Sequence, residues 1–226
     1  MTYRPKIADN GEYTYFCGWT ILSKIKDDMK MLENFIKHNK ILSLYFSPLP
    51  SSSYHITLYN LWCNRSPLLN EQQAVIDNET CGDLKEILEQ HSQSYGFFNP
   101  KNCMNKLFND INDLCNANQW SKLTLSINKV IWSGGTIRLS LKRSPEFDQL
   151  YKVRNSIINL RNKRDSMKYF HMTLAYNYRD IPKEELNNVV EQLNLLNVLL
   201  CDQSITLQNS GLYSFESMTS FQKFLK

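Results

Sequence analysis

One tetrapeptide pattern occurs twice in the chain: a histidine, an apolar residue, a threonine and a second apolar residue. The copies are HITL at 55–58 and HMTL at 171–174. Imidazole titrates near neutral pH, so it can accept or donate a proton, and a threonine hydroxyl can donate a hydrogen bond to an anion. Two such pairs facing each other could therefore act on both sides of a phosphodiester.

The spacing within each copy predicts a β-strand. Residues i and i+2 of a strand point to the same face, so His55 shares a face with Thr57, and His171 shares one with Thr173. The apolar residues of each copy point to the opposite face. A strand with an apolar back and a polar front suits a sheet whose polar side lines a cleft. We expect these strands at 54–62 and 168–178, where β-favouring residues surround each motif.

Each motif strand follows a strand and a helix. In the first half, aromatic and β-branched residues predict a strand over 12–22, Asp27 is a candidate cap for a helix to about 38, and an apolar run predicts a strand over 41–46. In the second half, alternation predicts strands at 123–131 and 136–142, joined at Gly134-Gly135. Ser144-Pro145 then begins a helix to about 163. A helix after Pro182 and a strand pair at 200–207 and 211–215 complete the chain.

These elements indicate an internal duplication within one domain, residues 1–226. Lobe one is about 11–63 and lobe two about 120–226, each carrying one motif. The polar connection, about 64–119, has helical periodicity at 83–91 and 102–116. The two motif strands should then be related by a pseudo-two-fold arrangement.

Composition limits the classes of function. The chain has 226 residues, 42% of them hydrophobic, and a net charge of +4, which favours an anionic ligand without the basic stripe of a long nucleic-acid partner. It has no apolar run of membrane-spanning length and no apolar signal at its start, so we expect a cytoplasmic protein. None of the six Cys forms a C-x-x-C pair, which favours reduced thiols over a disulfide framework or a zinc site. Abundant Asn, Lys and Ile are typical of an A/T-rich genome, such as that of a large DNA virus or a low-GC microbe.

Two His-x-Thr pairs across a cleft can cleave a phosphodiester without a metal. A neutral imidazole takes a proton from water or a ribose 2′-OH, and an imidazolium protonates the leaving oxygen. Thr57 and Thr173 would bind the non-bridging phosphate oxygens. The alternatives are two structural His, a metal site, or ordinary β-favoured Thr. The metal hypothesis is weaker, because no carboxylate or Cys stands at ligand spacing near either copy.

Other candidates have less specific signals. Arg138, Lys142 and Lys168 could steer a phosphate, although a solvated strand edge is an equal alternative for the first two. Tyr59 and Tyr169 share the parity of the motif His residues and could stack on a base, although most aromatics in such a chain are core. His38 and His91 end predicted helices, where a cation suits the helix dipole.

The paired H-x-T motifs, their strand context and the duplicated lobes resemble the 2H phosphoesterase superfamily of LigT-like proteins. The segment SPLPSSSYHITLYNLW at 47–62 is similar to the branch whose first motif follows a proline-containing loop. The resemblance extends from about 11 to 215, with the connection as an insertion. It implies an α+β, bilobed fold, with two antiparallel sheets flanking a central cleft and helices on the outer faces.

The resemblance also implies an activity. It predicts a phosphodiesterase that cleaves 2′-5′-linked or cyclic phosphodiesters in small nucleotides, such as 2′-5′ oligoadenylate (2-5A) or the cyclic dinucleotide cGAMP. Several viral relatives in this superfamily destroy such messengers of host immunity. It implies catalysis by His55 and His171, phosphate binding by Thr57 and Thr173, no cofactor, no metal, no membrane and a monomer. The alternatives are an enzyme that processes 2′,3′-cyclic phosphates or RNA ends, and a non-catalytic nucleotide-binding module.

Overall fold

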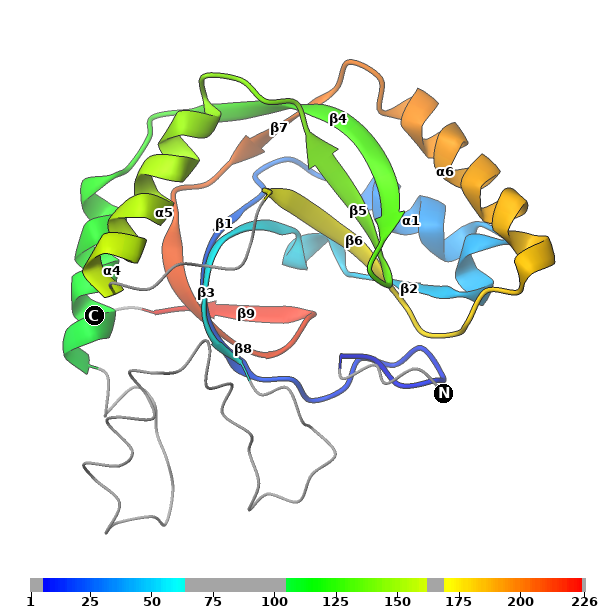
Figure 1. The fold of residues 1–226 in the computed structure, drawn as a ribbon, viewed down its shortest axis with the longest axis horizontal. Coiled ribbons are helices and arrows are strands. Elements are labelled where there is room, and N and C mark those ends of the chain that lie inside the picture. Colours follow the sequence, from blue (N-terminus) through cyan, green and yellow to red (C-terminus); the bar gives the residue numbers. More distant parts are fainter. Residues whose placement is uncertain (1–5, 64–104, 162–168, 225–226) are drawn as a thin grey trace, which may run out of the picture.

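A curled antiparallel sheet of nine strands organises the protein. The computed structural model describes residues 6–63, 105–161 and 169–224 (Figure 1). The strand order is β7-β4-β5-β6-β3-β1-β8-β9, and β2 also pairs with β6. The strands are β1 (Gly18–Lys24), β2 (Phe46–Pro48), β3 (His55–Cys63), β4 (Leu123–Ser133), β5 (Thr136–Leu141), β6 (His171–Asn177), β7 (Ser204–Leu207), β8 (Gly211–Ser217) and β9 (Ser220–Lys223).

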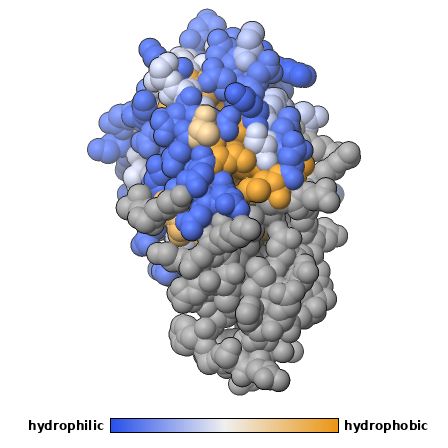
Figure 2. All heavy atoms as spheres, turned by 90° about the vertical axis from the view of Figure 1, so that its left-hand side faces the viewer, coloured by the Kyte–Doolittle hydropathy of each residue, from blue (hydrophilic) through white to orange (hydrophobic). Residues whose placement is uncertain are grey.

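Helices lie on the outside of this curl. They are α1 (Lys30–His38), α4 (Asn105–Ala117), α5 (Phe147–Arg161) and α6 (Leu186–Leu199), with short 3-10 turns at Leu42–Leu44, Ser51–Ser53 and Lys183–Glu185. α1 contacts β2, α6 contacts β4, α5 contacts β3 and α4 contacts β8 (Figure 1). Among the described residues on the face that carries α4 and α5, hydrophilic side chains predominate, with apolar side chains near the centre of the view (Figure 2). The predicted α+β class, with antiparallel strands inside and helices outside, is confirmed.

The structure has one sheet where two were predicted. The two predicted sheets correspond to its two arms, β7-β4-β5-β6 and β3-β1-β8-β9. They meet at β3 and β6, which pair through Ile56 and Met172. The backs of both motif strands are apolar as predicted, because Ile56, Leu58, Met172 and Leu174 are fully buried. Burial of these side chains favours the placement of both motif strands at the centre of the sheet.

Strand pairing crosses between the sequence halves. β2 comes from the first half but pairs with β6, whereas β8 and β9 come from the end of the chain and extend the arm that contains β1. The predicted pair at 200–207 and 211–215 is therefore wrong as a pair, although both strands exist. β7 pairs with β4 and β8 pairs with β1, because each adds to a different arm.

The hairpin at Gly134-Gly135 is confirmed. Their φ angles are +56° and +72°, the left-handed region that glycine adopts without steric cost. This turn joins β4 to β5 in direct antiparallel register, with Ser133 opposite Thr136. The register sets the parity of β5 and so decides which of its side chains face inward.

Several predicted boundaries in the first half were wrong. The first strand begins at Gly18 instead of residue 12, and residues 42–44 form a 3-10 turn instead of a strand. Asn39 explains the turn, because its side-chain oxygen accepts hydrogen bonds from the backbone N–H groups of Ile41 and Leu42 at 3.0 and 2.9 Å. Asp27 does not cap α1. Its carboxylate accepts a hydrogen bond from the backbone N–H of Thr206 instead.

The later boundaries differ less. The helix after Ser144-Pro145 begins at Phe147, and a 3-10 turn precedes α6 after Pro182. The predicted helix at 83–91 lies outside the described residues, and the helix predicted at 102–116 is described from Asn105. Among the described residues, no helix has both the length and the apolar character needed to cross a bilayer.

Met172→Ala should strongly destabilise the protein, because Met172 is fully buried at the junction of the two arms. Removal of its side chain should lower the free energy of unfolding by about 2–5 kcal/mol, measured by urea denaturation. Val198→Ala is the matched control, because Val198 is 74% exposed on α6 and should change stability by less than about 0.5 kcal/mol. Equal losses in the two variants would contradict the central place given to this junction.

Candidate active site

The two motifs interleave where β3 and β6 meet. In an antiparallel ladder, one step forward on a strand lies opposite one step back on its partner. Because Ile56 pairs with Met172, His55 lies beside Thr173 and Thr57 lies beside His171. All four side chains are half-buried and point away from the buried apolar backs. Each histidine therefore has the threonine of the other motif as its cross-strand neighbour.

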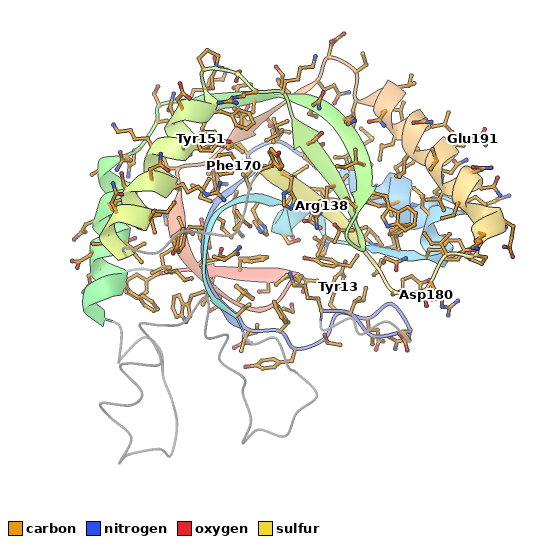
Figure 3. The ribbon with its side chains drawn as sticks, viewed as in Figure 1. Tyr13, Arg138, Tyr151, Phe170, Asp180 and Glu191 are labelled. Carbon is orange, nitrogen blue, oxygen red and sulfur yellow. The ribbon has the colours of Figure 1, made fainter. Side chains whose placement is uncertain are left out.

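Neighbouring strands continue this arrangement on both sides. Arg138 of β5 lies opposite Thr173, and Lys24 of β1 lies opposite His55. One row across four strands is therefore Lys24, His55, Thr173 and Arg138, with a cation at each end. Figure 3 shows Arg138 on the inner side of the curled sheet. Because Arg138 pairs with Thr173, the motif face lies on that side too.

Both imidazoles are held in the same way. His55 Nδ1 lies 2.7 Å from the carbonyl oxygen of Ser53, and His171 Nδ1 lies 3.3 Å from that of Tyr169. In each motif the carbonyl belongs to the residue two positions earlier. A carbonyl oxygen only accepts, so Nδ1 carries the hydrogen and donates it. The neutral tautomer then leaves the lone pair on Nε2, away from this backbone contact.

Burial and nearby cations favour the neutral form of both imidazoles. Burial is the main cause that lowers the pKa of His55 to about 4; Lys24, Lys6 and His171 act in the same direction, and the hydrogen bond to Ser53 opposes them. Burial also lowers the pKa of His171, and Arg138 and Lys6 act in the same direction. Every charge that acts on the two rings in the described part of the chain is positive. An anion between the rings would therefore be attracted and would raise both pKa values.

Sequence reasoning missed three residues of this site. Lys24 comes from β1 and Lys6 from the N-terminal segment. Phe221 comes from β9, and its ring centroid lies 4.4 Å from that of His55, tilted by 59°. Their own segments carry no motif, and only the order of strands brings them to the two His residues. The alternation of side chains along β1 would have indicated that Lys24 lies beside His55 only if the pairing of β1 with β3 had been known.

The other predicted residues are scattered. Tyr59 is 1% exposed, so its ring is in the core and the suggestion that it stacks on a base is wrong. Tyr169 is 76% exposed, and it lies two residues before the start of β6. Lys142 is exposed, 3.7 Å from the Asp202 carboxylate. Lys168 lies outside the described residues. His38 is exposed at the end of α1, with its Nδ1 2.9 Å from the carbonyl oxygen of Asn34.

The site is rich in bases and hydrogen-bond donors. Two imidazoles with Nε2 lone pairs can exchange protons, and two hydroxyls and a guanidinium can stabilise negative charge on phosphate oxygens. Within the described ranges, no group of three or more His, Cys, Asp or Glu residues gathers in a form that could hold a metal ion. The arrangement is suited to acid–base chemistry on an anion.

Comparisons with known proteins give relatives of low identity. No family model matches the sequence. The chain is 26% identical over 238 residues to the uncharacterized protein 127L of Invertebrate iridescent virus 6, covering 97% of this chain and 94% of that protein. The crystal structure of ATU0111, a conserved protein of unknown function from Agrobacterium tumefaciens, is similar at a TM-score of 0.62 and 11% identity, covering 99% of this chain and 94% of that one. It shares the fold.

A further structural match has a lower score. The structure of E. coli LigT complexed with ATP matches at a TM-score of 0.43 and 12% identity, covering 94% of this chain and 96% of that one.

The depressed pKa of His55 predicts a pH-dependent stability. The folded state resists protonation of His55 down to about pH 4, whereas the unfolded chain binds that proton near pH 6.5. The free energy of unfolding should therefore be unaffected by His55 above pH 6.5. As the pH drops towards 4 it should fall, by at most about 3 kcal/mol from this group.

Urea denaturation of the wild type and His55→Asn at pH 7.5 and pH 4.5 measures this effect. The Asn amide can still donate to the Ser53 carbonyl but does not titrate, so H55N should lose less stability on acidification. His38→Asn is the control, because His38 is exposed on α1, and it should keep the wild-type difference. An H55N protein with the wild-type loss would contradict the assignment.

Proposed function

We propose that this protein is a metal-independent phosphodiesterase of the 2H phosphoesterase type, acting on small nucleotides. The observation that carries the proposal is the interleaving of the two motifs around Ile56 and Met172, which places each histidine beside the threonine of the other motif. Two structural His residues would need neither matched backbone hydrogen bonds nor cations at both ends of their row. The iridescent virus relative supports a viral setting for the activity.

In the proposed mechanism the phosphodiester lies between the two imidazoles. His55 is the base, because burial keeps it neutral at working pH and its Nε2 lone pair is available. It removes a proton from water or from a ribose 2′-OH as the new oxygen–phosphorus bond forms. His171 gains its proton when the anionic substrate binds, and donates it to the leaving oxygen as the second oxygen–phosphorus bond breaks.

Charge that develops on the non-bridging oxygens meets donors on the same face. Thr57 and Thr173 donate hydroxyl hydrogen bonds, and Arg138 contributes a guanidinium next to Thr173. Such groups stabilise the transition state because they are already oriented before the reaction begins. Thr173 and Arg138 lie opposite each other on the paired strands β6 and β5, beside a register shift between Ile137 and Arg138.

The proposed substrates are small nucleotides with 2′-5′ or cyclic phosphodiesters, with 2′-5′ oligoadenylate and cGAMP first. The cations near the two rings suit an anion, while the net charge of +4 over the whole chain is modest for a protein that tracks a long strand. Cleavage of such messengers would oppose host antiviral nucleotide signalling. This function would be carried out in the cytoplasm by a monomer.

Hydrolysis of a defined panel tests the proposal. The panel contains 2′-5′ oligoadenylate, cGAMP, a 3′-5′ cyclic dinucleotide and a 2′,3′-cyclic mononucleotide, each with EDTA. His55→Ala and His171→Ala should each lower kcat by about 10²–10⁴, because each removes one proton transfer. His38→Ala, outside the site on α1, should keep wild-type activity.

The outcomes separate the alternatives. Activity on the cyclic mononucleotide alone would favour 2′,3′-cyclic phosphate processing. Binding of nucleotides without turnover would indicate a binding module. A fully active H55A or H171A protein would remove that residue from the mechanism. Loss of wild-type activity in EDTA would contradict metal-free chemistry.

Arg138→Gln should weaken transition-state stabilisation. Its guanidinium adjoins Thr173, so its removal should lower kcat/KM by about 10–100-fold, roughly the value of a charge-assisted hydrogen bond. Arg143→Gln is the matched control, because Arg143 is exposed just beyond β5 and should leave kcat/KM within about twofold. Steady-state kinetics on the preferred substrate of the panel give both values. Equal kinetics for R138Q and R143Q would exclude Arg138 from phosphate binding.

A further inference from the structure

The N-terminal segment forms a small, well-anchored hairpin below the sheet. Ile7 pairs with Tyr13, and the backbone N–H of Thr14 donates to the carbonyl oxygen of Lys6 at 3.2 Å. Gly11 turns the chain with a φ of +87°. The Tyr13 hydroxyl donates to the carbonyl oxygen of Ser47 at 2.7 Å, and Figure 3 shows this ring pointing from the segment towards the sheet. This anchoring fixes the position of Lys6.

The Lys6 ammonium group is held by aromatic residues. Its Nζ donates to the Tyr176 hydroxyl at 3.3 Å, and lies 4.9 Å from the ring centroid of Phe16 and 5.3 Å from that of Tyr176. Cation–π contacts and one neutral hydrogen bond orient an ammonium without neutralising it. In the described part of the chain, none of these contacts involves a carboxylate. The positive charge therefore stays available to an anion.

Lys6 belongs to the same inner face as the two catalytic candidates. Tyr176 lies opposite Thr136, whose hydroxyl accepts a hydrogen bond from Arg138 Nε at 2.5 Å. Lys6 is thus connected through Tyr176 and Thr136 to the Arg138 end of the row. It also acts on both imidazoles, lowering the pKa of each, whereas Lys24 acts on His55 and Arg138 acts on His171. Lys6 is the cation that the two His residues share.

One phosphodiester carries a single negative charge, and Arg138 and Lys24 already flank the row that would bind it. A third cation, supplied by a separate segment, exceeds what that group requires. We propose that Lys6 binds a second anionic group of the substrate, and that the preferred substrates are nucleotides with at least two phosphates. This assignment rests on the proposed function and identifies the substrate class of the same site.

A pair of substrates that differ by one phosphate tests the assignment. They are the 2′-5′-linked dinucleotide of adenosine, with and without a 5′-terminal monophosphate. The wild type should show a kcat/KM about tenfold or more higher for the phosphorylated compound, in the range of one charge-assisted contact. Lys6→Gln should lose most of this preference, so that its kcat/KM values for the two compounds become nearly equal.

Two further variants separate binding from structure. Lys6→Arg keeps the charge and should restore at least part of the preference. Lys152→Gln removes an exposed lysine from α5 and should leave the preference unchanged. In Lys6→Gln the acid limb of the pH–rate profile should move to higher pH, since a cation that lowers both histidine pKa values is gone. A purely structural role for Lys6 would lower the melting temperature without these changes.

The results that would overturn the assignment are specific. A wild type that hydrolyses both compounds equally, or a K6Q protein that keeps the full preference, would exclude Lys6 as a second phosphate ligand. If neither these two compounds nor any member of the panel is hydrolysed, the proposed function fails. Equilibrium binding of the same two compounds to the wild type and K6Q then tests Lys6. Equal affinity of the wild type for both compounds would contradict the assignment there too.

Discussion

The pairing of Ile56 with Met172 is the contact on which the candidate site depends. Both side chains are fully buried on the convex side, so the free energy that holds them there also fixes which residues point to the concave side. A shift of one residue in either strand would bury a histidine and expose an apolar residue. The geometry of the catalytic candidates is therefore maintained by the core.

The same contact explains why two motifs so far apart in sequence act as one unit. Each copy alone supplies a histidine and a threonine at i and i+2 of one strand, spaced along the strand direction. Antiparallel pairing then brings the histidine of one copy beside the threonine of the other. Parallel pairing would place like beside like, so the antiparallel arrangement is what mixes the two residue types around one point.

Local patterns left a solvated strand edge as an equal alternative for Arg138, but they were enough to predict the motif strands, their apolar backs and the Gly134-Gly135 hairpin. These features depend on periods of two residues and on turn chemistry, which neighbouring residues determine. Lys6, Lys24 and Phe221 could not be predicted in the same way, because they reach the site only through the order of strands. β9 was not predicted at all, although it carries the ring that packs on His55. Exchange of strands between the sequence halves is a property of long-range packing, which no local pattern encodes.

The electrostatics of the site make binding and protonation one process in the proposed mechanism. Burial and nearby cations lower the pKa values of both imidazoles, so neither ring is a strong candidate for the acid before an anion binds. An anion that binds between the two rings places a negative charge next to them. This raises the pKa of one ring enough for that ring to be protonated. Linkage requires the reverse effect as well, so the protonated site binds the anion more tightly than the neutral one.

His55 and His171 have the same tautomer and the same backbone hydrogen bond, and the difference between them comes from their surroundings. Phe221 packs on His55, whereas Arg138 lowers the pKa of His171. Two copies of one motif can therefore take opposite roles because the arms around them differ.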